Sequence, residues 1–253
     1  MRELERDSTS DTPVCKRLAI VGRGRVGYAL AAALRAAGYT VEGPLGRGAD
    51  GRGAEAVLLC VPDAEIERAA TRIVAGPLVG HCSGATGLGV LAPHEAFSLH
   101  PLMTITSEGA EFAGAGAAVA GSTQRAVGLA AELARSLGLR PVEIAEQDRA
   151  AYHAAASIAS NFLVTLEAAA ERVAGAVGVE RELLVPLVRA TVENWAKLGP
   201  ARALTGPVAR GDEATVARQR AAIGAAAGDL LPLFDALAEA TRALAAGREA
   251  QPA

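Results

Sequence analysis

Three polar side chains share one face of a stretch that is otherwise rich in alanine. His153, Ser157 and Asn161 are spaced i, i+4 and i+8, and residues at this spacing lie on one face of an α-helix. Between Arg149 and Glu167 the stretch has no charged residue other than His153, so we expect a mostly buried helix with a polar stripe. A buried polar stripe needs hydrogen-bond partners, which either neighbouring backbone or a bound small molecule can provide.

Two histidines are candidate proton donors, because an imidazole changes charge near neutral pH. His153 is the first candidate, although a histidine with satisfied hydrogen bonds in the core is the alternative interpretation. His100 is the second, and its position between a leucine and a proline suits a structural hydrogen bond equally well. Asn161, Ser157 and Ser83 are the residues that we expect to bind and orient a substrate.

The loop over residues 204–212 holds a third polar group. In it, Thr205, Arg210 and Asp212 can grip a carboxylate, with Arg210 as the ligand and Asp212 as its orienting partner. The alternative interpretation is a capped turn and nothing more. The sequence alone leaves both readings open.

A glycine-rich turn near the start of the chain points to a nucleotide. Residues 18–21 form an apolar run typical of a strand covered on both faces, and Gly22, Gly24 and Gly27 follow in GxGxxG spacing. In this pattern the first glycine makes a tight turn, the second admits a pyrophosphate, and the third lets a helix pack closely. The helix over 26–37 then offers free N–H groups to the phosphates. The predicted dinucleotide-binding residues of this turn are Gly22, Arg23, Gly24, Arg25, Val26 and Gly27.

A second strand is predicted at residues 39–41, and the loop that follows this strand selects the cofactor. An acidic residue about 20 positions after the glycines binds the ribose of NAD, whereas an arginine accommodates the 2′-phosphate of NADP. Glu42 directly follows residues 39–41 and is expected to continue the strand, while Arg47 lies beyond the end of that strand. We therefore favour NADP, with Arg23 or Arg25 as helpers. NAD remains possible, and a solvated loop charge is the alternative reading of Arg47.

Further strands and helices alternate up to about residue 147. We expect strands at 56–61, 77–82, 96–102, 117–121 and 141–144, and helices at 65–74 and from a Ser122 cap to Leu137. Ligands of open α/β sheets bind at the carboxyl ends of strands, so Val61, Pro62 and Asp63 should line the nicotinamide side of the cleft. The adjacent His81 and Cys82 cannot bind one metal with normal geometry, so no metal site is predicted.

The composition changes after that point, and four helices are predicted at 148–177, 181–198, 213–223 and 229–246. The predicted fold class is α/β: a Rossmann-type parallel sheet with helices on both faces, followed by an all-helical domain. The expected boundaries are a disordered tail at 1–15, a dinucleotide-binding domain at 16–147, a helical domain at 148–247 and a tail at 248–253.

Composition excludes several partners. The chain of 253 residues is 51% hydrophobic with a net charge of −3, so it has no basic footprint for nucleic acid. Its apolar runs are interrupted before bilayer length, and no membrane partner is expected. Its three cysteines are unpatterned, and its first residues lack an apolar secretory core, which favours the cytoplasm. Alanine-rich helical faces predict a homodimer formed through the helical domain.

Five motifs in order resemble one protein family. They are VGRGRVG at 21–27, HCSGA at 81–85, SLHPL at 98–102, YHAAASIASNFLVTL at 152–166 and ALTGPVARGD at 203–212. The chain resembles Rossmann-like proteins with a DUF2520 domain, within the 6-phosphogluconate dehydrogenase-like superfamily. The resemblance implies an NAD(P)-binding domain and a helical domain that often builds a dimer, similar in plan to ketopantoate reductase and pyrroline-5-carboxylate reductase.

Related superfamily enzymes use a lysine, sometimes with an asparagine, on the first helix of the second domain. The helix here has Asn161 and no lysine, so a lysine mechanism is not carried over. The resulting hypothesis is an NADP-dependent reductase that transfers hydride to the carbonyl carbon of a small oxo acid or to an imine carbon. The alternative is a non-catalytic NAD(P)-binding sensor or scaffold.

Overall fold

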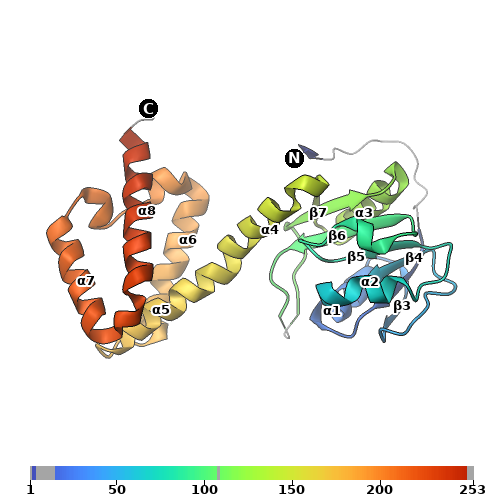
Figure 1. The fold of residues 1–253 in the computed structure, drawn as a ribbon, viewed down its shortest axis with the longest axis horizontal. Helices are drawn as coiled ribbons and strands as arrows, with labels where there is room; N and C mark the ends of the chain where they lie inside the picture. Colours follow the sequence, from blue (N-terminus) through green and yellow to red (C-terminus); the bar gives the residue numbers. More distant parts are fainter. Residues whose placement is uncertain (1, 4–14, 107–108, 250–253) are drawn as a thin grey trace. The chain divides into compact units, whose positions relative to one another are not determined.

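The computed structural model describes residues 2–3, 15–106 and 109–249, and the chain divides into two compact units, Met1–Ser160 and Asn161–Ala253 (Figure 1). The division comes later than the expected boundary at 147/148. The reason is that helix α4 (Arg149–Ser157) is hydrogen-bonded to the sheet of the first unit through Arg149 and Tyr152.

Eight strands form one sheet in the first unit, in the order β1-β8-β7-β6-β5-β4-β2-β3. Strands β2 to β6 are parallel, whereas β7 and β8 run the opposite way and parallel to each other. The strands are β1 (Arg2–Glu3), β2 (Arg17–Val21), β3 (Thr40–Leu45), β4 (Ala56–Leu59), β5 (Leu78–His81), β6 (Ala96–Leu102), β7 (Gly116–Gly121) and β8 (Arg140–Glu143).

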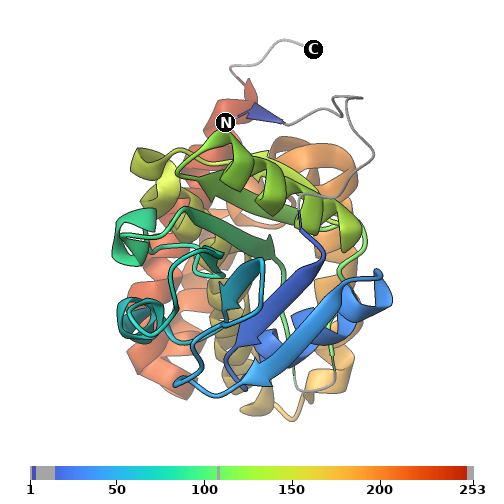
Figure 2. The same cartoon turned by 90° about the vertical axis from the view of Figure 1, so that its right-hand side faces the viewer.

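Alternate residues of each strand face opposite layers of helices (Figure 2). Leu18 and Ile20 of β2 pack with α1 (Arg25–Ala36) and α3 (Gln124–Ser136) on one face. Ala19 and Val21 pack with α2 (Ile66–Ala70) and the 3-10 turn Leu88–Leu91 on the other. This period of two on a doubly covered sheet confirms the predicted α/β fold class.

Strand β7 departs from the expected parallel sheet because of its connection. The described residues between β6 and β7 contain no helix, and a parallel crossover normally needs one, so β7 returns antiparallel to β6. Helix α3 is capped by Thr123, whose hydroxyl accepts from the N–H of Ala126. The expected cap, Ser122, instead accepts from the backbone N–H of Ala96 in β6.

Local differences also affect the tails and the second predicted strand. Strand β3 continues through Gly43 and Pro44, which the sequence assigned to the following loop. Residues 2–3 pair with β8 and Cys15 is buried, so part of the predicted N-terminal tail belongs to the sheet. The rest of that tail lies outside the described residues. At the other end, α8 extends to Glu249, inside the predicted tail at 248–253.

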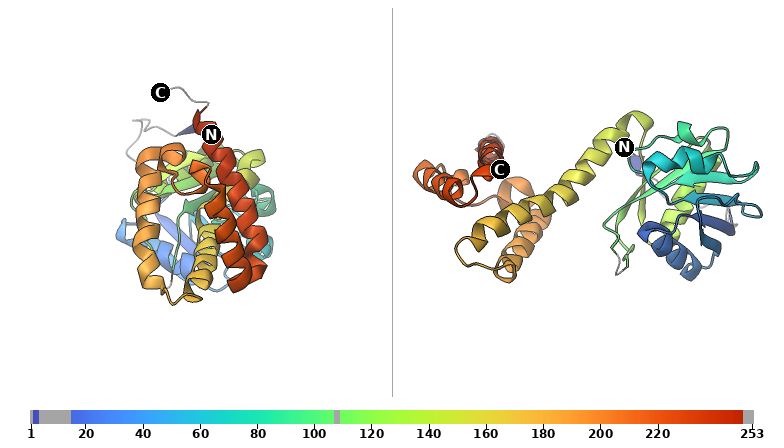
Figure 3. Two further views of the ribbon diagram at one scale, coloured as in Figure 1. Left: turned by 90° about the vertical axis from the view of Figure 1, so that its left-hand side faces the viewer. Right: turned by 60° about the horizontal axis from the view of Figure 1, so that its bottom comes forward.

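The second unit is helical throughout its described residues, as predicted. A π-helix (Ile158–Phe162) joins α4 to α5 (Leu163–Gly175), and α6 (Arg181–Ala203), α7 (Glu213–Ala227) and α8 (Leu231–Glu249) follow. Helix α8 packs against both α6 and α7, and α5 packs against α7 (Figure 3). Ion pairs join neighbouring helices, including Arg220–Asp235 and Arg242–Glu213.

One stretch of the described residues, Glu213–Gly247, is long and apolar enough to cross a membrane by length and hydropathy alone. This differs from the expectation that no apolar run reaches bilayer length. The stretch comprises α7, the 3-10 turn Gly228–Leu230 and α8, and the two helices pack against each other. Core helices of soluble proteins pass the same test.

Candidate functional site

The glycine turn after β2 has the shape that a dinucleotide requires. A Cβ added at Gly22 would lie 2.1 Å from the carbonyl oxygen of Cys60, and one at Gly27 would lie 2.0 Å from the carbonyl oxygen of Gly22. Both positions therefore admit only glycine. A Cβ at Gly24 would meet nothing within 4 Å, so the chain leaves open space where a pyrophosphate approaches.

The start of α1 also fits an anion. Its N-cap is Gly24, whose position provides no side-chain cap, and its first turn contains no acidic residue. The first N–H groups of a helix have no intrahelical partner, and the helix dipole favours negative charge beside them. Arg23 and Arg25 are exposed at this end of the helix. The residues present therefore fit the phosphates of a dinucleotide.

Three backbone hydrogen bonds fix the ends of four strands, β2, β3, β4 and β5, next to one another. The N–H of Gly22 donates to Leu45 at the end of β3, at 2.9 Å. The N–H of Cys60 after β4 donates to Val21, at 2.7 Å, and the N–H of Cys82 after β5 donates to Leu59, at 3.3 Å. The turn at Gly22 and the residues Val61 to Asp63 consequently share one edge of the sheet, as predicted from their order.

Arg47 lies two residues beyond β3, as expected, and Glu42 lies within the strand. The Arg47 guanidinium is 57% exposed and lies 3.5 Å from the Glu65 carboxylate at the start of the α2 segment. Glu65 also binds Arg68. An exposed guanidinium beside the glycine turn can still meet an added phosphate, because the Glu65 contact leaves its other N–H groups available.

The HCSGA segment builds a compact loop after β5. Nδ1 of the buried His81 accepts from the N–H of Ser83 at 3.2 Å, and its Nε2 lies 3.3 Å from the carbonyl oxygen of Gly87. The Ser83 hydroxyl donates to the Asp63 carboxylate at 2.7 Å and accepts from the N–H of Thr86 at 2.9 Å. Ser83 thus links the ends of β4 and β5 and orients Asp63.

Helix α4 runs along β6 toward the same edge. The buried Arg149 at its start donates to the Ser98 hydroxyl at 2.6 Å, and one turn later the Tyr152 hydroxyl lies 2.8 Å from Nδ1 of His100. The ring centroids of His100 and His153 are 6.3 Å apart. The structure therefore brings together the two histidines that the sequence proposed as alternatives.

Gly84 lies directly against both rings. A Cβ added there would be 3.0 Å from Nε2 of His100 and 3.0 Å from Cδ2 of His153. No residue in the described ranges hydrogen-bonds Nε2 of His100. The loop after β5, the end of β6 and α4 thus converge on one small polar region of the first unit, at the same edge of the sheet as the glycine turn.

Burial keeps three titratable side chains of this region uncharged. Burial, with help from the nearby Arg149, lowers the pKa of His81 to about 4. Burial likewise lowers the pKa of His100 to about 4, with help from His153. Burial raises the pKa of Tyr152 to about 12. His81, His100 and Tyr152 are therefore all uncharged near neutral pH.

The expected buried polar stripe is not found. Of α4 only Arg149 is buried, His153 and Asn161 are exposed, and Ile158 and Phe162 are 62% and 56% exposed. The alanine-rich sequence suggested that this helix is buried, but no other helix in the described part of the chain covers these side chains.

The π-helix also interrupts the α-helical spacing between Ser157 and Asn161, because it has a wider turn. Ser157 ends α4 in the first unit. Asn161, by contrast, begins the second unit. The i, i+4, i+8 alignment predicted from the sequence therefore does not persist along the whole segment.

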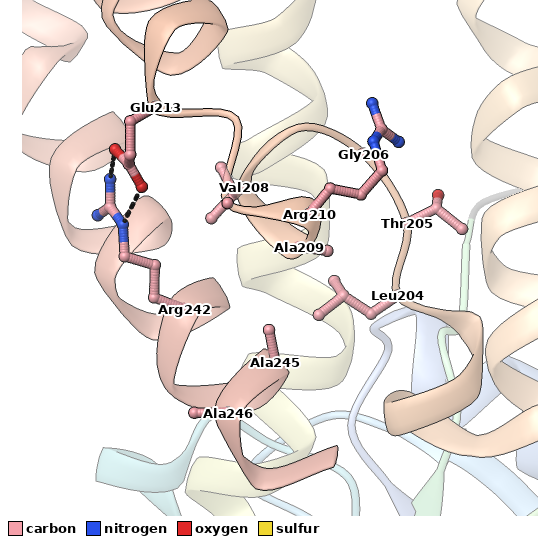
Figure 4. Close-up of a pocket in the computed structure, with 11 residues that line it drawn as sticks. Leu204, Thr205, Gly206, Val208, Ala209, Arg210, Glu213, Arg242, Ala245 and Ala246 are labelled. Carbon is pink, nitrogen blue, oxygen red and sulfur yellow. Dashed lines mark hydrogen bonds and ion pairs between the residues drawn. The ribbon is translucent and has the colours of Figure 1, made fainter. Parts of the chain in front are cut away.

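The loop over 204–212 borders a separate pocket of about 960 Å³ within the second unit (Figure 4). Figure 4 shows Arg210 extending away from the Arg242–Glu213 ion pair. Asp212 accepts from the N–H of Thr215 at 3.0 Å and caps α7. In the described part of the chain Asp212 forms no hydrogen bond with Arg210, so its observed role is the capped turn and not the orienting partner that was expected.

Sequence reasoning did not identify Tyr152, His81 and Arg149 as site residues. The sequence assigned no role to Tyr152 or Arg149, and His81 was considered only as a metal ligand. Among the described residues no group of three or more metal-ligating side chains is found. A signal for Tyr152 was present, since it is the one aromatic residue next to His153 in an alanine-rich segment.

A family model for DUF2520, a domain of unknown function, matches residues 94–241. This range includes β6 with His100, α4 with His153, and the loop at 204–212. A search of curated proteins finds no match to the chain.

Solved structures share the fold. The NADP-oxidoreductase-like protein BF3122 of Bacteroides fragilis is 18% identical with a TM-score of 0.78, covering 90% of this chain and 98% of that one. Protein TM1727 of Thermotoga maritima is 25% identical with a TM-score of 0.76, covering 92% and 99%. Pyrroline carboxylate reductase of Plasmodium falciparum, solved with NADP bound, is 15% identical with a TM-score of 0.58, covering 92% and 100%.

Proposed function

The chain belongs to the DUF2520 family, and we propose that it is an NADP-dependent oxidoreductase that reduces a small carbonyl or imine compound by hydride transfer. The observation that carries the proposal is the shared sheet edge in the first unit. At this edge the chain has both the glycine turn at 22–27, whose open space fits a pyrophosphate, and, two strands further along the sheet past β4 and β5, a polar region that contains His100 and His153. Two of the similar structures have names or contents that refer to NADP.

The bound cofactor would supply the hydride, and the chain would do the rest. Gly22, Gly24 and Gly27 would hold the pyrophosphate at the start of α1. Arg47 would meet the 2′-phosphate, and the segment Val61 to Asp63 would border the nicotinamide.

Reduction of a carbonyl group places negative charge on oxygen, which a positioned proton donor neutralises. His153 and His100 remain the two candidates, and their neighbouring rings favour a shared role over two independent ones. Ser83 would orient the substrate near Gly84, because its hydroxyl network fixes the loop there. Asn161 and Ser157 are kept as further substrate-orienting candidates.

A substrate carboxylate is the proposed ligand of Arg210, with Thr205 beside it. The Arg210 guanidinium has no ion-pair partner among the described residues, unlike Arg242 in the same pocket, which is paired with Glu213. An arginine without an ion-pair partner can donate two parallel N–H hydrogen bonds to the two oxygens of one carboxylate. Small oxo acids are for this reason the first substrates to test.

A homodimer formed through the helical unit is part of the proposal. Leu183, Leu187 and Trp195 of α6 are 70%, 65% and 57% exposed. Burial of such side chains against a second copy would remove apolar surface from water. The three free cysteines fit the cytoplasm, where thiols are kept reduced.

The test is NADPH oxidation by the purified full-length chain on a panel of small oxo acids and cyclic imines. We expect turnover with at least one compound and much weaker turnover with NADH. Tight NADPH binding without oxidation on any compound would instead support the sensor or scaffold alternative.

A Gly24→Ala variant supplies the internal control. Its new Cβ meets no protein atom within 4 Å, so thermal stability should stay unchanged while NADPH affinity falls at least about tenfold. Gly89→Ala, which is equally open, should change neither.

A further inference from the structure

Tyr152 is the residue of the first unit that contacts a candidate proton donor and has no part yet in the proposed reaction. Its hydroxyl lies 2.8 Å from Nδ1 of His100, and the two rings meet edge to face with centroids 5.5 Å apart. His100 in turn faces Gly84 with Nε2. Tyr152 therefore contacts Nδ1 of His100, while Nε2 of the same ring borders the proposed substrate region at Gly84.

The proton in this contact belongs to the tyrosine. Burial raises the pKa of Tyr152 to about 12, against a backbone hydrogen bond from Ala118 that lowers it. An N–H of Ala118 can only donate, and His100 is the one other partner that the described residues give this hydroxyl, so Nδ1 of His100 is the acceptor available to the phenol proton. Donation from the hydroxyl to Nδ1 leaves the ring proton of the neutral His100 on Nε2.

The surroundings of His100 keep that tautomer uncharged. Burial lowers the pKa of His100 to about 4, and most of the nearby charges act in the same direction. The titratable and charged groups that face it are Tyr152, His153 and Arg149 of α4, His81 of β5, and Asp63 after β4. A neutral imidazole with a fixed Nε2–H is a hydrogen-bond donor and not a cation.

We propose that Tyr152 is a positioning residue that fixes the Nε2–H tautomer of His100, and that the site thereby selects a carbonyl oxygen rather than an iminium nitrogen as the group it protonates. The proposal rests on the proposed reductase function and names its substrate class.

The chemistry distinguishes the two substrates. When hydride adds to a carbonyl carbon, the C=O electron pair moves to oxygen, Nε2 gives its proton to that oxygen, and Nδ1 takes the phenol proton. Water then returns a proton to Nε2 while Nδ1 gives its proton back to the Tyr152 phenolate, which restores the starting tautomer. An iminium nitrogen already holds its proton and offers no lone pair, so the Nε2–H donor contributes nothing to its reduction. The Asp63 carboxylate, which would favour a cation, is hydrogen-bonded by Ser83.

The experiment compares Tyr152→Phe with Tyr39→Phe in the full-length chain. Tyr39 is a matched control, because burial also raises its pKa to about 12 and its hydroxyl bonds Glu132 and Ser136 instead of a histidine. Two readouts are taken: steady-state kinetics on oxo acids and imines, and the protonation of the His100 ring nitrogens by nitrogen NMR of the protein without cofactor.

In the wild type we expect oxo acids to be reduced in preference to imines, with the ring proton of His100 on Nε2. Tyr152→Phe should lower kcat for the oxo acid by about tenfold to hundredfold with KM and NADPH affinity nearly unchanged, and its NMR spectrum should show both tautomers. Tyr39→Phe should match the wild type in both readouts.

Faster reduction of an imine than of any oxo acid would overturn the substrate class. A wild-type ring proton on Nδ1, or a Tyr152→Phe spectrum identical to the wild type, would overturn the positioning role. If no compound is reduced, the proposed function fails, and the NMR result still decides the role of Tyr152.

Discussion

The two units of the chain differ in how far their apolar side chains are buried. In the part of the chain that the structure describes, all but three of the buried hydrophobic residues belong to the first unit, and the three are Val216, Ala227 and Ala238. Ten of the thirteen large hydrophobic residues that are exposed belong to the second unit. A sheet covered on both faces completes its own core, whereas the helices of the second unit leave large apolar side chains exposed, and this exposed surface is the basis of the proposed homodimer.

This difference separates chemistry from assembly. The first unit holds a rigid set of turns at one sheet edge, fixed by backbone hydrogen bonds and by the buried His81 and Arg149. Binding turns of this kind need a rigid scaffold to keep their geometry. The second unit holds exposed apolar helices and the separate pocket at Arg210. The first unit therefore holds the candidate reaction site, and the second holds the exposed apolar helices to which the proposed dimer is assigned.

The largest expected effect is on turnover. His153→Ala should lower kcat by about 10²–10⁴-fold with NADPH binding intact, because a positioned acid acts on the substrate and not on the dinucleotide. His94→Ala is the matched control, since His94 bonds the carbonyl oxygen of Ala70 away from the site. Full turnover in His153→Ala, together with lowered thermal stability, would make His153 structural and leave His100 as the donor.

A substitution at Asn161 tests whether a residue of the second unit takes part in the reaction. Asn161→Ala should also lower turnover and leave NADPH affinity unchanged, although Asn161 begins the second unit. A loss that appears in KM alone would mean that Asn161 binds the substrate without orienting it for reaction. Unchanged kcat and KM would remove it from the site.

Lowering the pH should reduce the free energy of unfolding of the first unit more than that of the second. An unfolded imidazole titrates near pH 6.5, whereas His81 and His100 titrate near pH 4 in the fold because burial lowers their pKa. Between these values the unfolded chain binds more protons, so the free energy of unfolding falls as the pH drops. The stabilisation is complete above pH 6.5 and lost near pH 4, by about 3 kcal/mol per histidine.

Denaturant titrations between pH 7 and pH 4 measure this effect. The single tryptophan, Trp195, lies in α6 and reports on the second unit by its fluorescence, while circular dichroism reports on both units. We expect the sheet-containing unit to lose stability first. If the free energy of unfolding measured by fluorescence falls with pH as steeply as the one measured by circular dichroism, the effect does not belong to the first unit.

Cofactor choice is the next effect in size. Arg47→Ala should weaken NADPH binding by about tenfold to hundredfold and leave NADH binding nearly unchanged, because a charge-assisted contact contributes about 1.5–3 kcal/mol. Arg68→Ala is the control, since Arg68 also binds Glu65 but from α2. Equal losses for both cofactors in Arg47→Ala would rule out a contact with the 2′-phosphate.

The smallest effect concerns assembly. Leu187→Ser on α6 should weaken the homodimer by about tenfold, as measured by sedimentation over a range of concentrations. A leucine side chain that is partly buried in an interface contributes about 1.5 kcal/mol, the lower end of the range for full burial. Val177→Ser is the control, since Val177 is 78% exposed but lies between α5 and α6. A wild-type chain that sediments as a folded monomer at micromolar concentration would refute the dimer.

Much of the first unit could be predicted because its signals are local. Short apolar runs followed by glycine or proline mark the strand ends, and the GxGxxG spacing fixes the turn at Gly22. The direction of β7 could not be read in this way, since it depends on the lack of a crossover helix over the described residues before it. The choice of Thr123 over Ser122 as the helix cap differs by one residue, which is within the uncertainty of local patterns.

The site was predicted only in part because its contacts join distant segments. Tyr152 and His100 are 52 residues apart, and no periodic pattern links them. The exposure of α4 was also mispredicted, because an alanine-rich helix has the same composition whether its own chain or a partner covers it. Asp212 has a carboxylate that could orient an arginine, but in the structure this carboxylate accepts the N–H of Thr215 and caps the start of α7.

The central claim is that the edge shared by the Gly22 turn, His100 and His153 performs hydride transfer. It is tested most directly with NADPH deuterated at the nicotinamide C4 position and the best oxo acid of the panel. We predict one deuterium on the carbon of the former carbonyl group, with a slower rate than unlabelled NADPH gives. Bound NADPH that is never consumed, or a product without deuterium on that carbon, would contradict the account.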